Sequence, residues 1–410
     1  MRRRVVVTGM GVISPLGTGV GALEAGLREG RTGIRRMDDW GAVAAMLTRL
    51  AGPAEAPEVA QLPRKVSRTM GRVALLSTVA SQHAIDDARL SPEEVSSGRV
   101  GLAHGSTHGS SSASEQWIKT LVEQRGLLGL SGTTYLKFMS HTTAANLALH
   151  FGIRGRTIPT CAACVSSSLA IGQAFETVRS GAMDVMICGG AEELHFSHAA
   201  IFDVMHAASS RYNDAPDRSP RPFDRDRDGL VVGEGAGTLV LEEYERARAL
   251  GKTIHAEILG FGTSCDGTHI TNPSRDGMRS AMELALADAR LAPSDVGYVN
   301  AHATGTSVGD VAESQATRAL FGAQVPVSSL KGHLGHTLGA CGALEAIASV
   351  RMMHGGYVVP TRNLEHPDPA CADLDYVMGG LREARFDVFM SNKFAFGGLN
   401  TSLVFRAPRD

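Results

Sequence analysis

The chain has 410 residues, 43% of them hydrophobic, which is enough to bury one large core or two fused cores of ordinary domain size. Lys and Arg total 40 and Asp and Glu 42, so the net charge of −2 gives no indication of nucleic acid or membrane bound through bulk charge. No apolar run approaches the roughly 18 residues of a membrane span or a signal-peptide core. Six cysteines without an export signal predict reduced thiols and a cytoplasmic protein.

The first predicted element is a strand over residues 4–8, which runs into Gly9-Met10-Gly11. A Gly-x-Gly after a strand raises the possibility of a dinucleotide fingerprint. However, Pro15 interrupts the expected helix start and the third glycine is misplaced. We therefore do not favour a nucleotide site here.

A basic segment follows at residues 62–72. Arg64, Lys65, Arg68 and Arg72 recur at helical spacing, which would put them on one side of a helix. The simplest interpretation is a solvated face, and the alternative is a docking patch for an acidic partner.

A helix over residues 73–90 is followed by Ser91-Pro92, an N-cap and first-turn proline that predict a new helix start. A strand over 100–103 then enters a loop that contains His104 and His108. The same succession of helix, proline turn, strand and histidine loop returns about half a chain later, from Asp288 to His302. This recurrence predicts an α/β protein with two related halves, which we divide at 1–250 and 251–410.

The most informative stretch is Thr160–Ser168, in which small residues surround Cys164 between an apparent strand and a helix. One buried helix face is predicted from the spacing of Ile171, Ala174, Phe175 and Val178. Gly181 is expected to end this helix. A thiol in the first turn would face the positive end of the helix dipole, which favours the nucleophilic thiolate. A buried small residue and a Cys161–Cys164 redox pair are the alternatives.

Three further loops carry polar groups amid glycine. They are 300–306 with His302, 331–336 with His333 and His336, and 391–400. None has the Gly-Lys-Ser/Thr ending of a phosphate-binding loop. A single histidine at a strand end is usually structural, but a thiol with two separate histidine loops indicates catalysis.

These four loops, together with residues 221–237, resemble the β-ketoacyl-[acyl carrier protein] synthases of elongating type I and type II, including type II polyketide ketosynthases. The resemblance runs from Val5 to Phe405. It implies a thiolase fold, two similar halves in layered αβαβα packing, and a dimer. It also implies an acyltransferase that extends an acyl chain by two carbons through decarboxylative condensation with malonyl-acyl carrier protein.

By this resemblance Cys164 is the nucleophile, and His302 and His336 polarise the malonyl thioester during decarboxylation. Lys331 matches an active-site lysine whose field tunes His336 and Glu313. The resemblance selects His336 over His333 and makes Cys161 a small buried residue. It implies no metal and no cofactor, since the substrates are carried on the phosphopantetheine of an acyl carrier protein.

The resemblance also implies roles for residues around the nucleophile and on the surface. They are the backbone N–H groups of Cys164 and Phe396 as an oxyanion hole, Phe396 also as a gate, Thr304 and Thr306 for pantetheine, His108 in the acyl pocket, Lys65 and Arg68 for carrier-protein docking, and Glu313 and Asp310 as supporting residues.

The pathway is less determined than the chemistry. Fatty-acid elongation is the main hypothesis, but the variant Phe-Ala-Phe-Gly-Gly-Leu-Asn at 394–400 resembles ketosynthases of polyene-forming type II polyketide systems. Those pair with a chain-length factor, so the partner is either a second copy or such a subunit. A catalytically silent chain-length factor is the weaker alternative, because such subunits lose the nucleophile. A thiolase is disfavoured because Phe396 stands where its second cysteine would be expected.

Overall fold

The computed structural model describes residues 3–409. Up to Ala249 the elements are β1 (Val5–Ser14), β2 (Gly17–Thr18), α1 (Val20–Arg28), β3 (Arg35–Arg36), η1 (Asp38–Ala42), β4 (Leu50–Gly52), η2 (Pro57–Gln61), α2 (Arg64–Ser67), α3 (Arg72–Asp87), α4 (Pro92–Val95), β5 (Val100–Gly105), α5 (Ser111–Gln124), α6 (Tyr135–Phe138), α7 (Thr142–Phe151), β6 (Thr157–Thr160), η3 (Ala163–Val165), α8 (Ser166–Arg179), β7 (Val185–Glu192), α9 (Phe196–Val204), η4 (Pro216–Arg218), β8 (Val232–Gly233), β9 (Gly235–Glu243) and α10 (Tyr244–Ala249).

From Ala256 onward the elements are β10 (Ala256–Cys265), α11 (Arg275–Ala289), η5 (Pro293–Asp295), β11 (Tyr298–Asn300), α12 (Ser307–Phe321), β12 (Pro326–Ser328), α13 (Lys331–Leu334), η6 (Leu338–Ala340), α14 (Cys341–Gly355), β13 (Tyr357–Val358), β14 (Asp375–Tyr376), β15 (Arg382–Glu383), β16 (Val388–Ala395) and β17 (Leu399–Arg406).

The sheet repeats one topology twice. In the first half the strands lie in the order β6-β5-β7-β9-β1, and in the second half they lie in the order β12-β11-β16-β17-β10. In each half the first three strands are parallel and the last two pair antiparallel. Antiparallel pairing of β1 with β10 joins the halves. The recurrence seen in the sequence is therefore a repeat of a whole folding unit.

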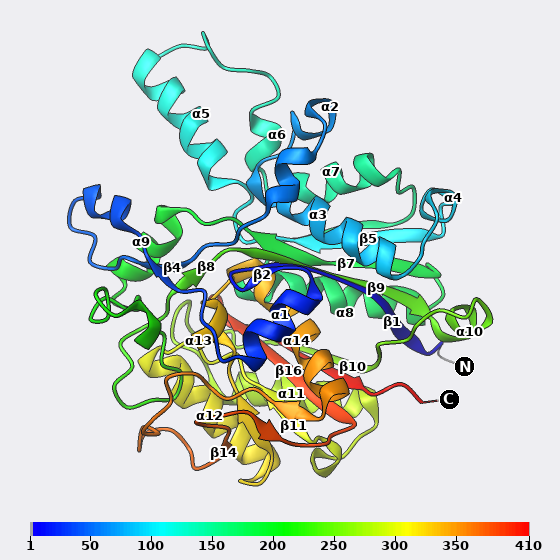
Figure 1. Cartoon of the computed structure of the whole chain (residues 1–410), viewed down its shortest axis with the longest axis vertical. Helices are drawn as coiled ribbons and strands as arrows, with labels where there is room; N and C mark the ends of the chain where they lie inside the picture. The colour runs from blue at the N-terminus through cyan, green and yellow to red at the C-terminus, as the bar shows by residue number, and fades with distance from the viewer. Residues whose placement is uncertain (1–2, 410) are drawn as a thin grey trace.

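Helices cover both faces of the sheet and fill the space between its halves. Figure 1 shows α3 outside β5, β7 and β9, α8 and α14 in the middle, and α11 and α12 in the lower part of the molecule with β16 and β11. The central layer is the apolar core: α8 and α14 bury residues around their whole circumference, including Phe175 and Ile347. This is the layered αβαβα packing that the family resemblance implies.

Helix α8 forms as its periodicity predicts. Its predicted inward face is buried in full, at Ile171, Ala174, Phe175 and Val178. The helix ends at Arg179, and Gly181 adopts a φ of 79°, the left-handed conformation that glycine takes without strain. The predicted helix start at Ser91 is also confirmed, with a complete capping box between Ser91 and Glu94.

The first strand is longer than predicted, because it continues through Gly9 and Gly11. They lie inside β1, which continues to Ser14 against α3. A Cβ on Gly9 would stand 2.1 Å from the Ala84 carbonyl oxygen, and one on Gly11 would stand 1.9 Å from that of Ala80. These glycines therefore let a helix backbone lie against the strand.

The predicted single basic face at residues 62–72 is wrong. Only α2, one turn long, forms there, and α3 starts separately at Arg72. Arg72 turns away from the other three basic residues and pairs with Glu234 at 2.9 Å. Lys65 and Arg68 remain exposed. Among the described helices, none has the length and apolar content needed to cross a membrane.

Candidate active site

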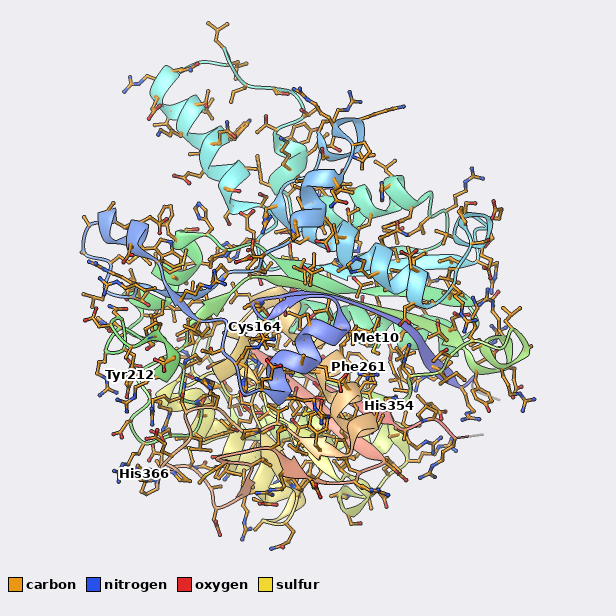
Figure 2. All side chains as sticks on the ribbon, viewed as in Figure 1. Met10, Cys164, Tyr212, Phe261, His354 and His366 are labelled. Carbon is orange, nitrogen blue, oxygen red and sulfur yellow. The ribbon has the colours of Figure 1, made fainter. Side chains whose placement is uncertain are left out.

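Cys164 lies in η3, at the point where β6 turns into the central helix α8. The residue before it, Ala163, has a φ of 47°, a left-handed conformation that a residue with a side chain rarely adopts. Ser166 holds this turn, because its hydroxyl donates to the Ala163 carbonyl and accepts from the Ala162 N–H. Cys164 is 7% exposed and lies well inside the molecule (Figure 2).

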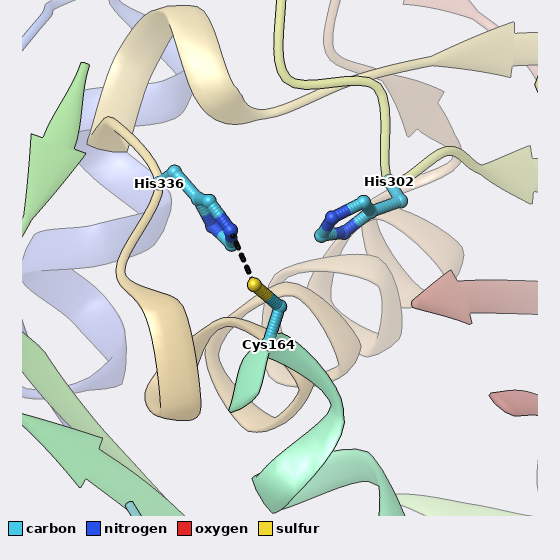
Figure 3. A group of neighbouring side chains, drawn as sticks. All are labelled: Cys164, His302 and His336. Carbon is cyan, nitrogen blue, oxygen red and sulfur yellow. Dashed lines mark hydrogen bonds between the residues drawn. The ribbon is translucent and has the colours of Figure 1, made fainter. Parts of the chain in front are cut away.

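Two histidines from the second half face this thiol. His336 Nε2 lies 3.0 Å from Cys164 Sγ. The His302 ring lies across from them, with its centroid 5.1 Å from that of His336 and the two planes at 82° (Figure 3). One ligand atom from each of the three side chains lies within 4.8 Å of the others. A thiol and two imidazoles, far apart in the sequence, thus converge on one point.

Burial decides the protonation of these three groups. It raises the pKa of the Cys164 thiol, an effect that Cys341 adds to and Lys331 opposes. It also lowers the pKa of His302 and His336 well below the ordinary histidine value, and Lys331 lowers both further. Burial therefore outweighs the helix start, which by itself favours the thiolate, and the thiol form of Cys164 is favoured beside neutral imidazoles.

Behind the imidazoles lies a buried ion cluster. Lys331 Nζ contacts a carboxylate oxygen of Glu345, and Lys393 Nζ lies 3.0 Å from the other oxygen. Burial opposes the charge of Lys331, but Glu345 raises the pKa of Lys331 above its ordinary value. Burial lowers the pKa of Lys393. One carboxylate thus supports two buried ammonium groups, whose field adds to the effect of burial in keeping the imidazoles uncharged.

Two carboxylates shape the His302 loop from behind. Glu313 accepts hydrogen bonds from the backbone N–H groups of His302 and Ala303, at 2.7 and 2.6 Å. Asp310 accepts from the backbone of Thr304 at 3.1 Å. Burial raises the pKa of Glu313 to about 7 and that of Asp310 to about 6. Both hold backbone rather than face the thiol.

A cavity of about 340 Å³ opens onto the three converging side chains. Thr304 and Thr306 line it, with their hydroxyl oxygens 3.1 Å apart. Phe396 also lines it, is 37% exposed, and packs against Phe202 at a centroid distance of 5.6 Å. The residues that line the cavity include the exposed His269 and the buried Cys164, so the cavity extends from the surface to the thiol.

Other predicted residues lie elsewhere. His108 is exposed, does not line this cavity, and stacks on His198 at 4.7 Å. Cys161 is exposed rather than buried, with its thiol 3.3 Å from the Thr107 carbonyl oxygen, so that expectation is wrong. His333 is buried between two carbonyl oxygens, those of Arg31 and Pro360, and does not reach the cavity.

Sequence reasoning missed Glu345 and Lys393. Glu345 lies in the interior of α14, where all but three residues are buried and a charged side chain requires a buried partner. That anomaly is the signal that could have identified it. Lys393 lies in the interior of β16 among buried residues and gives the same signal. The sequence does not show that both meet Lys331.

Comparison with known proteins defines the class of this fold and site. The family model described as "Beta-ketoacyl synthase, N-terminal domain" matches residues 2–247, and "Beta-ketoacyl synthase, C-terminal domain" matches residues 255–365. The chain belongs to the β-ketoacyl synthase family, and it is a condensing acyltransferase with the thiolase fold.

One relative and two solved structures are similar to the chain over essentially its whole length. The chain is 40% identical to 3-oxoacyl-[acyl-carrier-protein] synthase 2 of Synechocystis sp., covering 99% of this chain and 98% of the relative. A β-ketoacyl synthase structure from Burkholderia phymatum is 50% identical and superposes with a TM-score of 0.96 over 100% of both chains. The ishigamide ketosynthase/chain length factor structure is 33% identical, with a TM-score of 0.92 over 100% of both chains.

Proposed function

We propose that this condensing enzyme carries its growing acyl chain on Cys164 and extends it by two carbons with malonyl-acyl carrier protein. The observation that carries the proposal is the 3.0 Å contact between Cys164 Sγ and His336 Nε2 at the base of a cavity, with His302 facing both. A nucleophile, a base within hydrogen-bond reach and a second donor are what acyl transfer and enolate chemistry require.

In the loading step, Cys164 Sγ attacks the thioester carbonyl of an acyl carrier protein substrate. His336 Nε2 accepts the thiol proton and returns it to the departing pantetheine thiolate, so the acyl group moves to Sγ and a free carrier thiol leaves. A neutral imidazole is needed to accept this proton, and burial keeps His336 neutral. The backbone N–H groups of Cys164 and Phe396 would hold the oxyanion, each such donor contributing about 3–4 kcal/mol.

In the condensation step, malonyl-acyl carrier protein loses carbon dioxide and leaves an enolate. The electron pair then forms a bond to the acyl carbonyl carbon, the bond from that carbon to Cys164 Sγ breaks, and the departing thiolate takes a proton from solvent. His302 and His336 would each donate one N–H to the enolate oxygen, which requires His336 to be in its Nε2–H tautomer in this step. The ammonium groups held by Glu345 make a charged imidazolium unfavourable, so the histidines stabilise the enolate by hydrogen bonding.

The cavity would bind the substrate arm, and the protein surface would bind its carrier. The paired hydroxyls of Thr304 and Thr306 would bind the amides of a phosphopantetheine arm in the cavity. Lys65 and Arg68, exposed on and beside α2, would dock the acidic carrier protein. The name of the Synechocystis relative supports a carrier-bound substrate, since that protein is an acyl-carrier-protein synthase.

A second subunit is part of the proposal. Helix α5 projects from the body of the molecule (Figure 1), and the segment around it exposes apolar side chains that a partner would cover. These are Ile118, Val122, Leu127, Leu128, Tyr135 and Met139. Either a second copy or a chain-length factor would fit. The ishigamide relative, which comprises a ketosynthase and a chain length factor, supports the second arrangement and with it the polyene pathway as the alternative to fatty-acid elongation.

The test is acyl loading followed by intact-protein mass spectrometry. The wild type and Cys164→Ala are each offered saturated and polyunsaturated acyl carrier proteins. We expect a thioester adduct on the wild type alone, and the preferred acyl group separates fatty-acid from polyene extension. Cys341→Ala is the matched control, because this neighbouring thiol donates to the Cys164 carbonyl but does not line the cavity. An adduct on Cys164→Ala would contradict the assignment.

A further inference from the structure

A second group of ligand-type side chains lies outside the active-site cavity. His108 follows β5, Glu192 is the last residue of β7, and His198 lies in α9. Since β5 and β7 are adjacent parallel strands, their carboxyl ends bring the first two residues together. One ligand atom from each of the three side chains lies within 4.8 Å of the others.

Two buried atoms of this group make no hydrogen bond of normal geometry among the described residues, although Thr107 and the backbone of Glu193 lie close enough to interact with these side chains. Glu192 is fully buried and its Oε1 accepts no hydrogen bond, although its Oε2 accepts from the backbone N–H groups of Thr107 and Gly339 at 2.8 and 3.1 Å. His198 is 2% exposed, and its Nδ1 likewise makes no such hydrogen bond. An unsatisfied carboxylate oxygen and an unsatisfied ring nitrogen are costly in a dry interior.

The second polar atom of both His198 and Glu192 is held by a hydrogen bond, as is usual for metal-binding side chains. The second ring nitrogen of His198 is held by the Ser111 hydroxyl at 2.6 Å, and the second carboxylate oxygen of Glu192 is held by backbone. Outer contacts of this kind fix the tautomer and orientation of metal-binding side chains and leave one atom of each directed at the ion. His108 is exposed, so it gives an ion a path from solvent.

We propose that His108, Glu192 and His198 form a binding site for a divalent transition-metal ion such as Zn²⁺. Two imidazoles and one carboxylate suit zinc, whereas Mg²⁺ and Ca²⁺ prefer oxygen ligands alone. Bonds of about 2 Å require ligand atoms roughly 3.3 Å apart, so His108, the exposed member, moves toward the other two on binding. The ion ties the loop after β5 to β7 and α9. The proposal does not rest on the catalytic role of Cys164, although the charge of Glu192 acts on that thiol.

The experiment uses the full chain carrying Cys164→Ala, because the Cys164, His302 and His336 trio offers its own set of metal-binding atoms. Equilibrium dialysis against Zn²⁺ is expected to give one ion per chain. Co²⁺ in its place is expected to give visible ligand-field bands without the near-ultraviolet charge transfer of a thiolate ligand. No bound ion in this variant would overturn the proposal.

Second substitutions then locate the ion. His108→Ala, which changes an exposed side chain and is expected to fold, should weaken binding by at least the roughly 10–100-fold typical of losing a supporting contact. His198→Ala should do the same. His195→Asn is the matched control, since His195 caps α9 nearby and is engaged with Glu115. Unchanged affinity in both His108→Ala and His198→Ala, or equal loss in His195→Asn, would overturn the site.

Discussion

The two halves of the molecule share a topology but differ in what their central helices carry. Helix α8 follows Cys164 and begins with three buried serines, Ser166, Ser167 and Ser168. Helix α14 begins at the equivalent place with Cys341 and buries Glu345 one turn later. One half thus presents a neutral nucleophile, and the other builds a buried charge cluster.

This difference shows how a repeated fold can divide the work of one site. Burial raises the pKa of both thiols, that of Cys341 to about 11, so neither helix start by itself yields a thiolate. Only Cys164 lines the cavity and has an imidazole at hydrogen-bond distance. The loops that follow β11 and β12 supply that imidazole and its partner. The two cysteines therefore differ in their position relative to these loops, and not in their position at a helix start.

The largest expected effect distinguishes the two histidines. Both His302→Ala and His336→Ala should reduce malonyl decarboxylation by about 10²–10⁴-fold, since each removes one donor to the enolate. Only His336→Ala should also slow acyl loading, because His336 alone contacts Cys164 Sγ. Loading rates measured by rapid quench with radiolabelled acyl carrier protein, beside carbon dioxide release, check this. Equal loading defects in both variants would contradict it.

The next largest expected effect is on stability and concerns the charge cluster of the second half. Glu345→Gln leaves Lys331 and Lys393 buried without their carboxylate and should lower the free energy of unfolding by about 3–5 kcal/mol. Denaturant unfolding measures this. Glu283→Gln is the control, because it breaks an exposed pair with Arg279 and should cost no more than about 0.5 kcal/mol. A cost for Glu345→Gln as small as that of the control would contradict the cluster's role.

This contrast also marks what the sequence could predict. The inward face of α8 and the cap at Ser91 follow from spacing within a few residues, and both were predictable. The repeated halves were predictable because a helix, turn and strand recur in order. Local pattern carries this information.

Contacts between distant segments were not predictable in this way. The spacing of Arg72 predicts that it lies on a local basic face, but in the structure it forms an ion pair with Glu234, which is far away in the sequence. The roles of Gly9 and Gly11 were not predicted, because nothing nearby reveals that α3 packs on them. Burial also raises the pKa of the Cys164 thiol against the local effect of the helix start, and the extent of that burial cannot be read from neighbouring residues.

Stability should also fall as pH rises. Burial raises the pKa of Glu313 to about 7 from an ordinary value of 4.5, so the folded protein binds this proton more tightly than the unfolded chain does. The contribution is full below about pH 4.5 and is lost as pH rises toward 7, about 3 kcal/mol in all. Asp310 opposes ionisation of Glu313, and Lys393 favours it.

Denaturant unfolding at pH 5 to 8 tests this, with Glu313→Gln compared with the wild type. The amide does not titrate, so the variant should show a shallower decline of the free energy of unfolding with pH, whatever its absolute stability. Glu192, buried in the first half with a pKa raised to about 7, should retain its own share of the decline in that variant. An identical slope in variant and wild type would exclude Glu313 as a source of the pH dependence.

The smallest expected effect concerns the surface of the first half. Reversing charge with Lys65→Glu and Arg68→Glu should raise the KM for acyl carrier protein several-fold, because an acidic partner is repelled, while kcat and stability stay unchanged. Arg385→Glu, on an exposed site of the second half, is the matched control. Raised salt should reduce the difference in KM between the double variant and the wild type, since exposed charges are screened. A KM defect that persists at high salt would mean that shape, rather than charge, governs docking at α2.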